Sequence, residues 1–206
     1  SHEIFNFQVF MYKIDKILIG THNKGKFKEI SDLLPKKVEK ISPNDLGIES
    51  PKEDGKTFVQ NSELKANFFC NKSKLVTLSD DSGLEINCLN GEPGIFSSRW
   101  AKEFGGFNNA MTEILKKVKK SNKDKKAQFV CSLTIQWPDG KKISEVGIIK
   151  GNISSKKGNN GFGYDPIFIP NGYSKTFAEM DYKEKLLIDH RHVAYKKLSE
   201  KIKVYF

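Results

Sequence analysis

A glycine- and lysine-containing stretch near the start of the chain, GTHNKGK at residues 20–26, suits the binding of phosphate. Gly20, Gly25 and Lys26 have the spacing of the pattern G-x-x-x-x-G-K-[ST], in which backbone N–H groups cradle phosphates. An apolar run precedes the stretch and a helical pattern follows, so N–H groups and a helix dipole would point at an anion. Phe27 stands where a magnesium-binding hydroxyl is expected, so any metal must be held elsewhere. An ordinary strand–turn–helix connection is the alternative.

Two adjacent carboxylates in the second stretch, LSDDSGLEI, suit a metal ion and the activation of water. Asp80 and Asp81 would repel each other unless a cation lies nearby or the chain turns them apart. Mg²⁺ prefers few protein carboxylates together with waters and phosphate oxygens. The pair therefore offers one carboxylate ligand and one base, although a solvated turn rich in aspartate is the alternative.

The third stretch, KEDGKTFVQNSELKAN, places acidic residues in a loop before a predicted helix. Glu53 and Asp54 lie in that loop, and Lys65 lies two turns beyond Thr57 in the helix. A loop carboxylate could complete a metal site when substrate arrives, while Lys65 holds phosphate or orients the attacking water. Loop solvation and a surface lysine are the alternatives.

The fourth stretch, GNNGFGYDPIF, is followed by KEKLLIDHRH. Three glycines interleaved with Phe162 and Tyr164 indicate a loop that can approach a ligand closely and offer a ring to stack on a base. His190 and Arg191 carry hydrogen-bond donors that could address a carbonyl oxygen of a purine. A helix cap and a salt bridge are the alternative for these two residues.

The elements that must position these stretches alternate between strand and helix. The patterns predict an α/β fold around a mixed sheet, with a hairpin at 128–137 and 141–150 joined around PDG. Further strands are expected at 16–20, 38–41, 75–78, 84–89 and 166–169, and helices at 26–34, 57–73, 108–120 and 177–202.

The amino-acid composition limits the classes of protein to which the chain can belong. The chain has 206 residues, 35 basic and 25 acidic side chains and a net charge of +10, which invites a nucleic-acid interpretation. Arg99 and Arg191 are its two arginines, so side chains that read guanine edges are scarce.

The three cysteines form no C-x-x-C pair, which predicts a reducing, cytoplasmic setting. The sequence shows no stretch typical of a membrane span or a secretory signal. Residues 1–12 are interpreted as a tag or N-terminal extension, with Met11 a plausible start. Residues 13–206 are predicted to form a single domain.

The order of the motifs THNKGK, EDGKTFVQNSELKA, DDSGLE, GEPGIFSSR and GFGYDPIF resembles the inosine/xanthosine triphosphate pyrophosphatase family, from residue 17 to about 197. This resemblance implies hydrolysis of ITP, dITP and XTP to the monophosphate and pyrophosphate with Mg²⁺, which cleanses the nucleotide pool. It also implies a homodimer of two-lobed subunits, each with a long twisted mixed sheet flanked by helices and a cleft between the lobes. No nucleic acid or membrane partner is expected.

The resemblance also implies roles for individual residues. Glu53 and Asp81 would hold the metal, and Asp81 would accept the proton, with Asp80 and Lys65 supporting it. The substrate would contact a larger set, namely Thr21, His22, Asn23, Lys24, Gly25, Lys26, Ser82, Phe162, Gly163, Tyr164, Asp165, Lys185, His190 and Arg191.

Three positions depart from the family pattern. His22 replaces a common glycine, Lys52 stands where many members have glutamate, and Asp189 precedes His190 where serine is usual. Two other functions stay open: a related pyrophosphatase acting on other modified or pyrimidine nucleotides, and a lysine-rich nucleic-acid-binding protein without catalysis.

Overall fold

The structure, a computed structural model, describes residues 13–121 and 124–206. The extension predicted at residues 1–12 lies outside these described residues. The chain divides into two compact units. The first, which we call unit 1, comprises the chain up to Asp80 together with Ser132–Val146 and Ala194–Phe206, and unit 2 comprises Asp81–Cys131 and Gly147–Val193.

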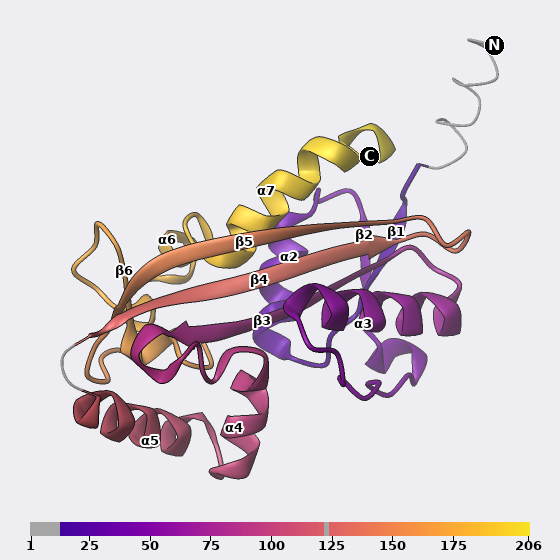
Figure 1. The fold of residues 1–206 in the computed structure, drawn as a ribbon. Helices are drawn as coiled ribbons and strands as arrows, with labels where there is room; N and C mark the ends of the chain where they lie inside the picture. Colours follow the sequence, from indigo (N-terminus) through magenta and orange to yellow (C-terminus); the bar gives the residue numbers. More distant parts are fainter. Residues whose placement is uncertain (1–12, 122–123) are drawn as a thin grey trace. The chain divides into compact units, whose positions relative to one another are not determined.

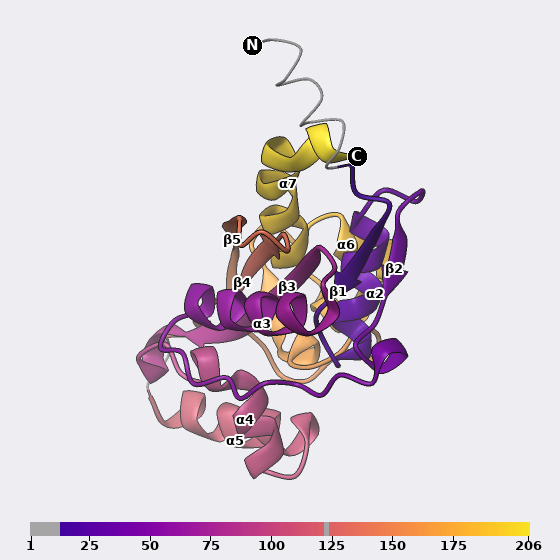
Figure 2. The same cartoon turned by 90° about the vertical axis from the view of Figure 1, so that its right-hand side faces the viewer.

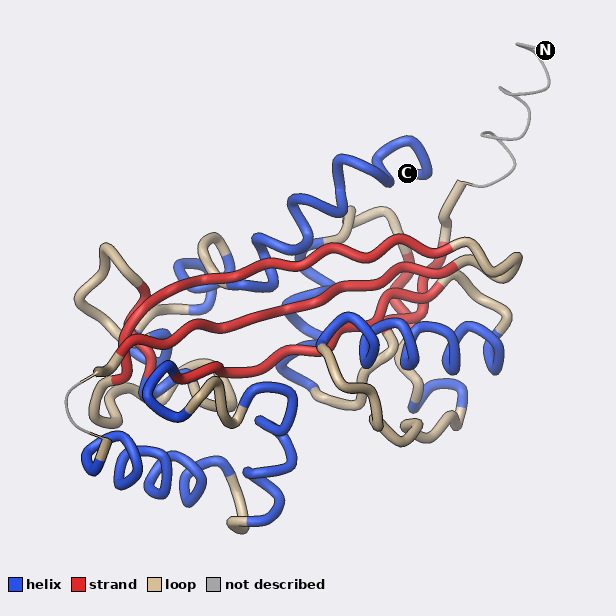
Figure 3. Tube along the Cα trace, in the orientation of Figure 1, coloured by secondary structure: helices blue, strands red, loops and turns tan. Residues whose placement is uncertain are grey.

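A six-stranded sheet runs through the chain in the order β2-β1-β3-β4-β5-β6 (Figure 3). β1 is parallel to both β2 and β3, whereas β5 and β6 are antiparallel, so the sheet is mixed. This confirms the predicted α/β class. The strands are β1 (Lys16–Ile19), β2 (Glu39–Ile41), β3 (Thr77–Ile86), β4 (Lys126–Gln136), β5 (Lys142–Ile153) and β6 (Phe168–Pro170).

In unit 1, β1 lies between β2 and β3, and two helices make the crossovers. The connection through α2 (Lys24–Leu33) leads from β1 to β2, and the connection through α3 (Phe58–Ser73) returns past β1 to β3. Such crossovers are right-handed, so two connections that run in opposite directions along the sheet put their helices on opposite faces. Figures 1 and 2 show α2 and α3 on opposite faces of the sheet. The carboxyl ends of β1 and β3 consequently form a topological switch point, where ligands bind in open α/β sheets.

Polar contacts as well as apolar ones hold α3 on the sheet. Thr57 caps the helix by accepting a hydrogen bond from the N–H of Gln60, as the sequence predicted. One turn further on, the Ser62 hydroxyl lies 2.8 Å from the hydroxyls of both Ser132 and Thr134 on β4. Ser62 and Ser132 are fully buried, so these bonds fix the height and rotation of α3 over β4.

Unit 2 has its own apolar core. β3 and β4 contribute Leu84, Ile86 and Phe129, and these pack with Phe168 and Phe177. Its helices are α4 (Ser97–Glu103), α5 (Phe107–Lys120), α6 (Tyr182–Leu186) and the first residues of α7 (His190–Ile202), whose remainder belongs to unit 1. No helix in the described parts of either unit combines the length and hydrophobicity that crossing a bilayer requires.

Two local predictions need correction. The strands expected at 75–78 and 84–89, with a turn at SDDSG between them, are one continuous strand, β3. Asp80 is fully buried in it, so these polar residues belong to a buried strand and not to a solvated turn. Helix α4 at Ser97–Glu103 was not predicted, because its seven residues are too few to show a helical period. The hairpin is confirmed, with the N–H of Trp137 donating to the carbonyl oxygen of Lys141 at 2.8 Å.

Candidate functional site

The loop between β1 and α2 carries the first predicted stretch. At its start, Gly20 lies so close to β3 that an added Cβ would be 2.1 Å from the Ser79 hydroxyl oxygen. Thr21 accepts a hydrogen bond from the N–H of Asn23 at 3.1 Å, and Asn23 accepts one from the N–H of Lys26 at 2.9 Å. The first bond within the helix runs from Phe27 to Asn23, so the N–H groups of Lys24 and Gly25 have no acceptor inside the helix. This is the geometry of an anion site.

A buried ion pair connects this loop to β3. The ammonium of Lys26 lies 3.4 Å from a carboxylate oxygen of Asp80, whose side chain is fully buried. A carboxylate removed from water requires such a partner. Lys26 keeps 16% of its side chain exposed, so its charge is also accessible from the carboxyl ends of β1 and β3.

The acidic loop and α3 meet in a second ion pair within unit 1. Lys65 Nζ lies 3.0 Å from Glu53 Oε1, with side-chain exposures of 9% and 41% respectively. Side chains at the start of α3 tie down the same loop, because Asn61 accepts from the N–H of Gly55 and Gln60 from that of Lys56. Lys65 is therefore not the surface lysine of the alternative interpretation, and Glu53 is the more accessible partner.

In unit 2, the residues after Asp80 in β3 lie beside the start of α7. Asp81 is buried, and the next residue, Ser82, accepts a hydrogen bond from an Arg191 guanidinium nitrogen at 3.0 Å. Arg191 is 1% exposed. His190, the first residue of α7, stacks on the ring of Phe129 at 4.7 Å between centroids and 13° between planes.

The glycine-containing loop is tied to α6 by a second buried pair. Lys185 Nζ lies 2.7 Å from Asp165 Oδ2, and the same oxygen accepts from the N–H of Phe162 at 3.0 Å. The Lys185 ammonium is also 4.5 Å from the centroid of the Phe162 ring, and the Arg191 guanidinium carbon is 5.6 Å from it. The ring of Phe162 therefore lies within cation–π distance of two cations.

Other members of that loop have internal roles. Tyr164 is buried, and its hydroxyl donates to the carbonyl oxygen of Ser97, while burial raises its pKa. Gly158 has a φ of +90°, and a Cβ there would lie 2.3 Å from the backbone of Ala178. The close approach inferred from these glycines is thus partly an approach to the protein's own backbone, and Phe162 is the more exposed aromatic ring of the loop.

The structure brings together most of the predicted side chains, in separate sets. Unit 1 pairs Lys26 with Asp80 and Glu53 with Lys65, and His22 packs its ring near Phe69. Unit 2 connects a larger set through the contacts given above, namely Ser82, Phe162, Asp165, Lys185 and Arg191. The peptide bond from Asp80 to Asp81 joins the two units in β3.

One further residue, which contacts Lys185 of the unit 2 set, carried no predicted role. Asp189 is fully buried, and its side chain lies 3.9 Å from Lys185 Nζ and accepts from the N–H of His192 at 2.8 Å. The available signal in the sequence was its position, because an aspartate just before a helix is a typical N-cap.

The acidic side chains also limit how a metal could bind. Across the described ranges, no group of three or more His, Cys, Asp or Glu side chains is arranged to hold an ion. Mg²⁺ commonly uses one or two protein carboxylates and takes its other ligands from water and substrate phosphates, so a site of this kind would need no such group. Glu53, with its accessible carboxylate, and Asp81 supply donors of that type.

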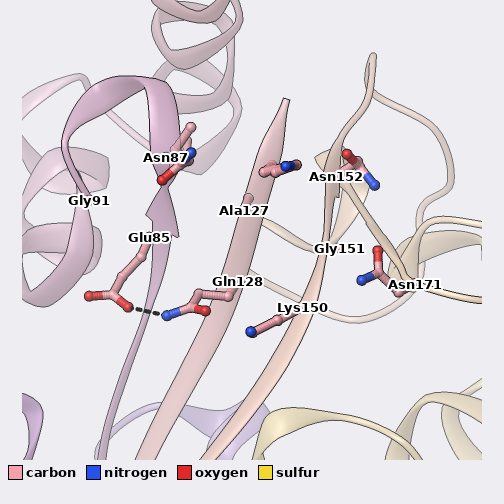
Figure 4. A pocket seen from close by; sticks show the side chains of 11 residues that line it. Glu85, Asn87, Gly91, Ala127, Gln128, Lys150, Gly151, Asn152 and Asn171 are labelled. Atoms are coloured by element: carbon pink, nitrogen blue, oxygen red, sulfur yellow. Dashed lines mark hydrogen bonds between the residues drawn. The ribbon is translucent and has the colours of Figure 1, made fainter. Parts of the chain in front are cut away.

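Unit 2 also contains two hollows. One, of about 410 Å³, is lined by Phe162 and Gly163 together with Asn108, Met111 and Lys156, and so adjoins the predicted site. The other, of about 610 Å³, crosses β3, β4 and β5 and is shown in Figure 4. Glu85 accepts a hydrogen bond from Gln128 at 2.8 Å on its wall, and none of the predicted site residues lines it.

Comparisons with known proteins identify the family of the chain. The model of the Ham1 family matches residues 17–201. A dITP/XTP pyrophosphatase of Zymomonas mobilis is 41% identical over 187 residues, covering 89% of this chain and 90% of that protein. A dITP/XTP pyrophosphatase of Rhodospirillum centenum is 39% identical over 188 residues, covering 89% of this chain and 93% of that protein.

Solved structures give the same result for the fold. A HAM1 protein from Coxiella burnetii superposes with a TM-score of 0.81 at 32% identity, covering 91% of this chain and 98% of that one. The Ham1 protein of Staphylococcus aureus superposes with a TM-score of 0.80 at 34% identity, with the same coverage of 91% and 98%.

Proposed function

Because the chain belongs to the Ham1 family, we propose that it hydrolyses the triphosphates of deaminated purines, ITP, dITP and XTP, to the monophosphate and pyrophosphate. The observation that carries this proposal is the match of almost the whole chain to relatives named dITP/XTP pyrophosphatases. The ion pairs and the helix N-terminus at the predicted phosphate residues support it independently.

The phosphate chain binds at the start of α2 in this proposal. The N–H groups of Lys24 and Gly25, the helix dipole and the Lys26 ammonium all attract an anion there. Thr21 and Asn23 use their side chains to hold the loop in that conformation. Lys65 supplies a second cation, which Glu53 holds in place at 3.0 Å.

Asp81 is the group that we assign to the attacking water. Its carboxylate takes a proton as the water oxygen forms a bond to the α-phosphorus, and the bond between that phosphorus and the bridging oxygen of pyrophosphate breaks. Glu53 and Asp81 would hold Mg²⁺, which when bound neutralises charge on the phosphates. Asp80 stays paired with Lys26 at 3.4 Å and keeps that lysine turned toward the phosphate loop.

The base binds in unit 2, at the exposed face of Phe162. Arg191 and Lys185 are buried donors close to that ring, and both suit the 6-oxo acceptor that inosine and xanthosine share. Adenosine carries an amino donor at this position, so its binding would leave a buried donor unpaired, which can cost about 10⁴-fold in kcat/KM. GTP has the same 6-oxo group, so its exclusion depends on the 2-amino group.

The substrate panel that tests this proposal contains ITP, dITP, XTP, GTP, ATP and dTTP, each assayed with and without Mg²⁺. Phosphorus NMR identifies the products. We expect pyrophosphate and the monophosphate from the first three nucleotides, with kcat/KM at least 100-fold above that for ATP, and no turnover after chelation of the metal. Preference for dTTP or another pyrimidine would favour the related pyrophosphatase, and salt-dependent binding of oligonucleotides without hydrolysis would favour the nucleic-acid-binding alternative.

We further propose that residues 13–206 act as one two-lobed homodimeric enzyme in the cytoplasm. The similarity of nearly the full chain to single-family relatives supports the first part. Light scattering coupled to gel filtration measures the mass of the assembly, and a monomer of about 23.4 kDa would contradict the dimer.

A further inference from the structure

We propose that the buried carboxylate of Asp189 makes this enzyme favour hypoxanthine triphosphates, ITP and dITP, over xanthine triphosphate. This inference rests on the proposed function and assigns a base preference to the same site. Asp189 is a positioning residue in this proposal: its charge acts on the groups around the base, and it does not touch the reacting atoms.

Lys185 lies between two carboxylates that have almost no contact with water. Its ammonium is 2.7 Å from Asp165 and 3.9 Å from Asp189, and the three side chains are 3%, 4% and 0% exposed. Asp165 alone gives the ammonium a close ion pair and also accepts from the N–H of Phe162. Asp189 therefore adds a second negative charge where one already satisfies the lysine.

The position of Asp189 on α7 keeps its charge in place. One of its carboxylate oxygens accepts from the N–H of His192 at 2.8 Å, in the first turn of the helix. The positive end of the helix dipole favours the ionised form of a carboxylate at such a position. A serine could make the same capping bond without the charge. The capping bond alone thus does not require aspartate here.

Among the charged side chains that contact Phe162 or Lys185, two cations are consequently matched by two anions. Lys185 and Arg191 are the cations close to the Phe162 ring, and Asp165 and Asp189 are the anions close to Lys185. Nearby titratable groups on the packed elements include His190, which is stacked on Phe129, and His192, whose N–H binds Asp189. Further titratable residues on these elements are Asp181, Tyr182, Lys183 and Glu184 at α6, and Tyr195, Lys196, Lys197, Glu200 and Lys201 along α7. A pocket with balanced charge favours a neutral ligand over an anionic one.

The two candidate bases differ in this respect. The second oxo group makes xanthine acidic enough to lose a proton near neutral pH, whereas hypoxanthine keeps its proton until the solution is alkaline. A buried carboxylate about 8 Å from an anionic base, at an effective dielectric of about 20, repels it by an amount worth roughly tenfold or more in binding. The repulsion acts on ionised XTP and leaves ITP unaffected.

The test measures the ratio of kcat/KM for XTP to that for ITP in the wild type and in Asp189→Asn, at pH 5.5 and at pH 8. Asparagine keeps the shape and the capping bond while removing the charge. Asp189→Ser, which also caps, is the second variant if the first fails to fold by circular dichroism. Asp181→Asn is the matched control, because Asp181 caps α6 by accepting from the N–H of Glu184 at 2.8 Å and is exposed.

We expect the ratio at pH 8 to rise about tenfold in Asp189→Asn and Asp189→Ser, to stay within about twofold of wild type at pH 5.5, and to stay unchanged in Asp181→Asn. A ratio that is unchanged at pH 8, or that changes equally at both pH values, would overturn the inference, since a purely structural role lowers both substrates together. If the wild type releases no pyrophosphate from either nucleotide, the proposed function itself fails, which is a distinguishable result.

Discussion

The consecutive carboxylates Asp80 and Asp81 show how neighbouring side chains can have different environments. Asp80 is fully buried and lies 3.4 Å from Lys26, so its charge is balanced inside unit 1. Asp81 follows in unit 2, just before the Ser82 hydroxyl that Arg191 contacts. Neighbouring side chains of an extended strand face opposite sides, which keeps the two like charges apart. The residue types could be recognised from the sequence, but their partners, far away along the chain, could not.

The role assigned to Asp81 predicts the effect of removing its charge. Asp81→Asn should lower kcat for ITP by about 10³-fold or more, because asparagine cannot accept the proton of the attacking water. The measurement is steady-state release of pyrophosphate, with circular dichroism to verify the fold. Asp15→Asn, at an exposed carboxylate outside the candidate site, is the control and should keep normal activity. A near-normal rate in Asp81→Asn would remove the assignment.

Among the secondary-structure elements, β3 differs most from its prediction. A period-two interpretation of SDDSG predicts a turn, because five polar or small residues in a row show no apolar face. In the structure they continue a ten-residue strand, because Lys26 on α2 and Arg191 on α7 compensate their polarity. A tertiary contact thus overrode a local signal.

Signals confined to neighbouring residues predicted their elements well. Thr57 begins α3 by capping it, and the PDG turn closes the hairpin of β4 and β5 with Gly140 at a φ of +95°. Both depend on bonds within a few residues, which the sequence displays directly. The grouping of the predicted residues within unit 2 depends on contacts across more than 100 residues, such as that of Arg191 with Ser82, and needed the structure.

The close packing of β1 against β3 predicts a large effect of one methyl group. Gly20→Ala would put a Cβ 2.1 Å from the Ser79 hydroxyl and 2.7 Å from the Phe69 ring, so the strands must shift. We expect the free energy of unfolding to fall by about 2–3 kcal/mol, in the range of overpacked cores. Urea unfolding measures the loss.

A second substitution distinguishes this clash from a general effect of alanine. In Gly20→Ala combined with Ser79→Ala, the nearest obstructing atom is gone, so part of the lost stability should return. Equal stability of the single and double variants would show that the Ser79 hydroxyl is not the obstacle.

Across the whole molecule, burial divides the three cysteines. Cys70 and Cys131 are buried in units 1 and 2 respectively, whereas Cys88 is partly exposed. Burial raises the pKa of the Cys70 thiol, so less of the reactive thiolate is present at any given pH. We expect a maleimide at pH 7.5 to modify Cys88 first in the native protein and the other two after unfolding in urea. Peptide mass spectrometry identifies the sites, and rapid native labelling of Cys70 would contradict the packing described for α3.

The most direct test of the proposed activity uses one turnover of ITP in water enriched in ¹⁸O, with Mg²⁺ present. Attack of water at the α-phosphorus predicts one ¹⁸O atom in the inosine monophosphate and none in the pyrophosphate, as read by mass spectrometry. Label in pyrophosphate, or release of labelled orthophosphate with inosine diphosphate, would contradict the assignment of the phosphate chain to the α2 loop and of the water to Asp81.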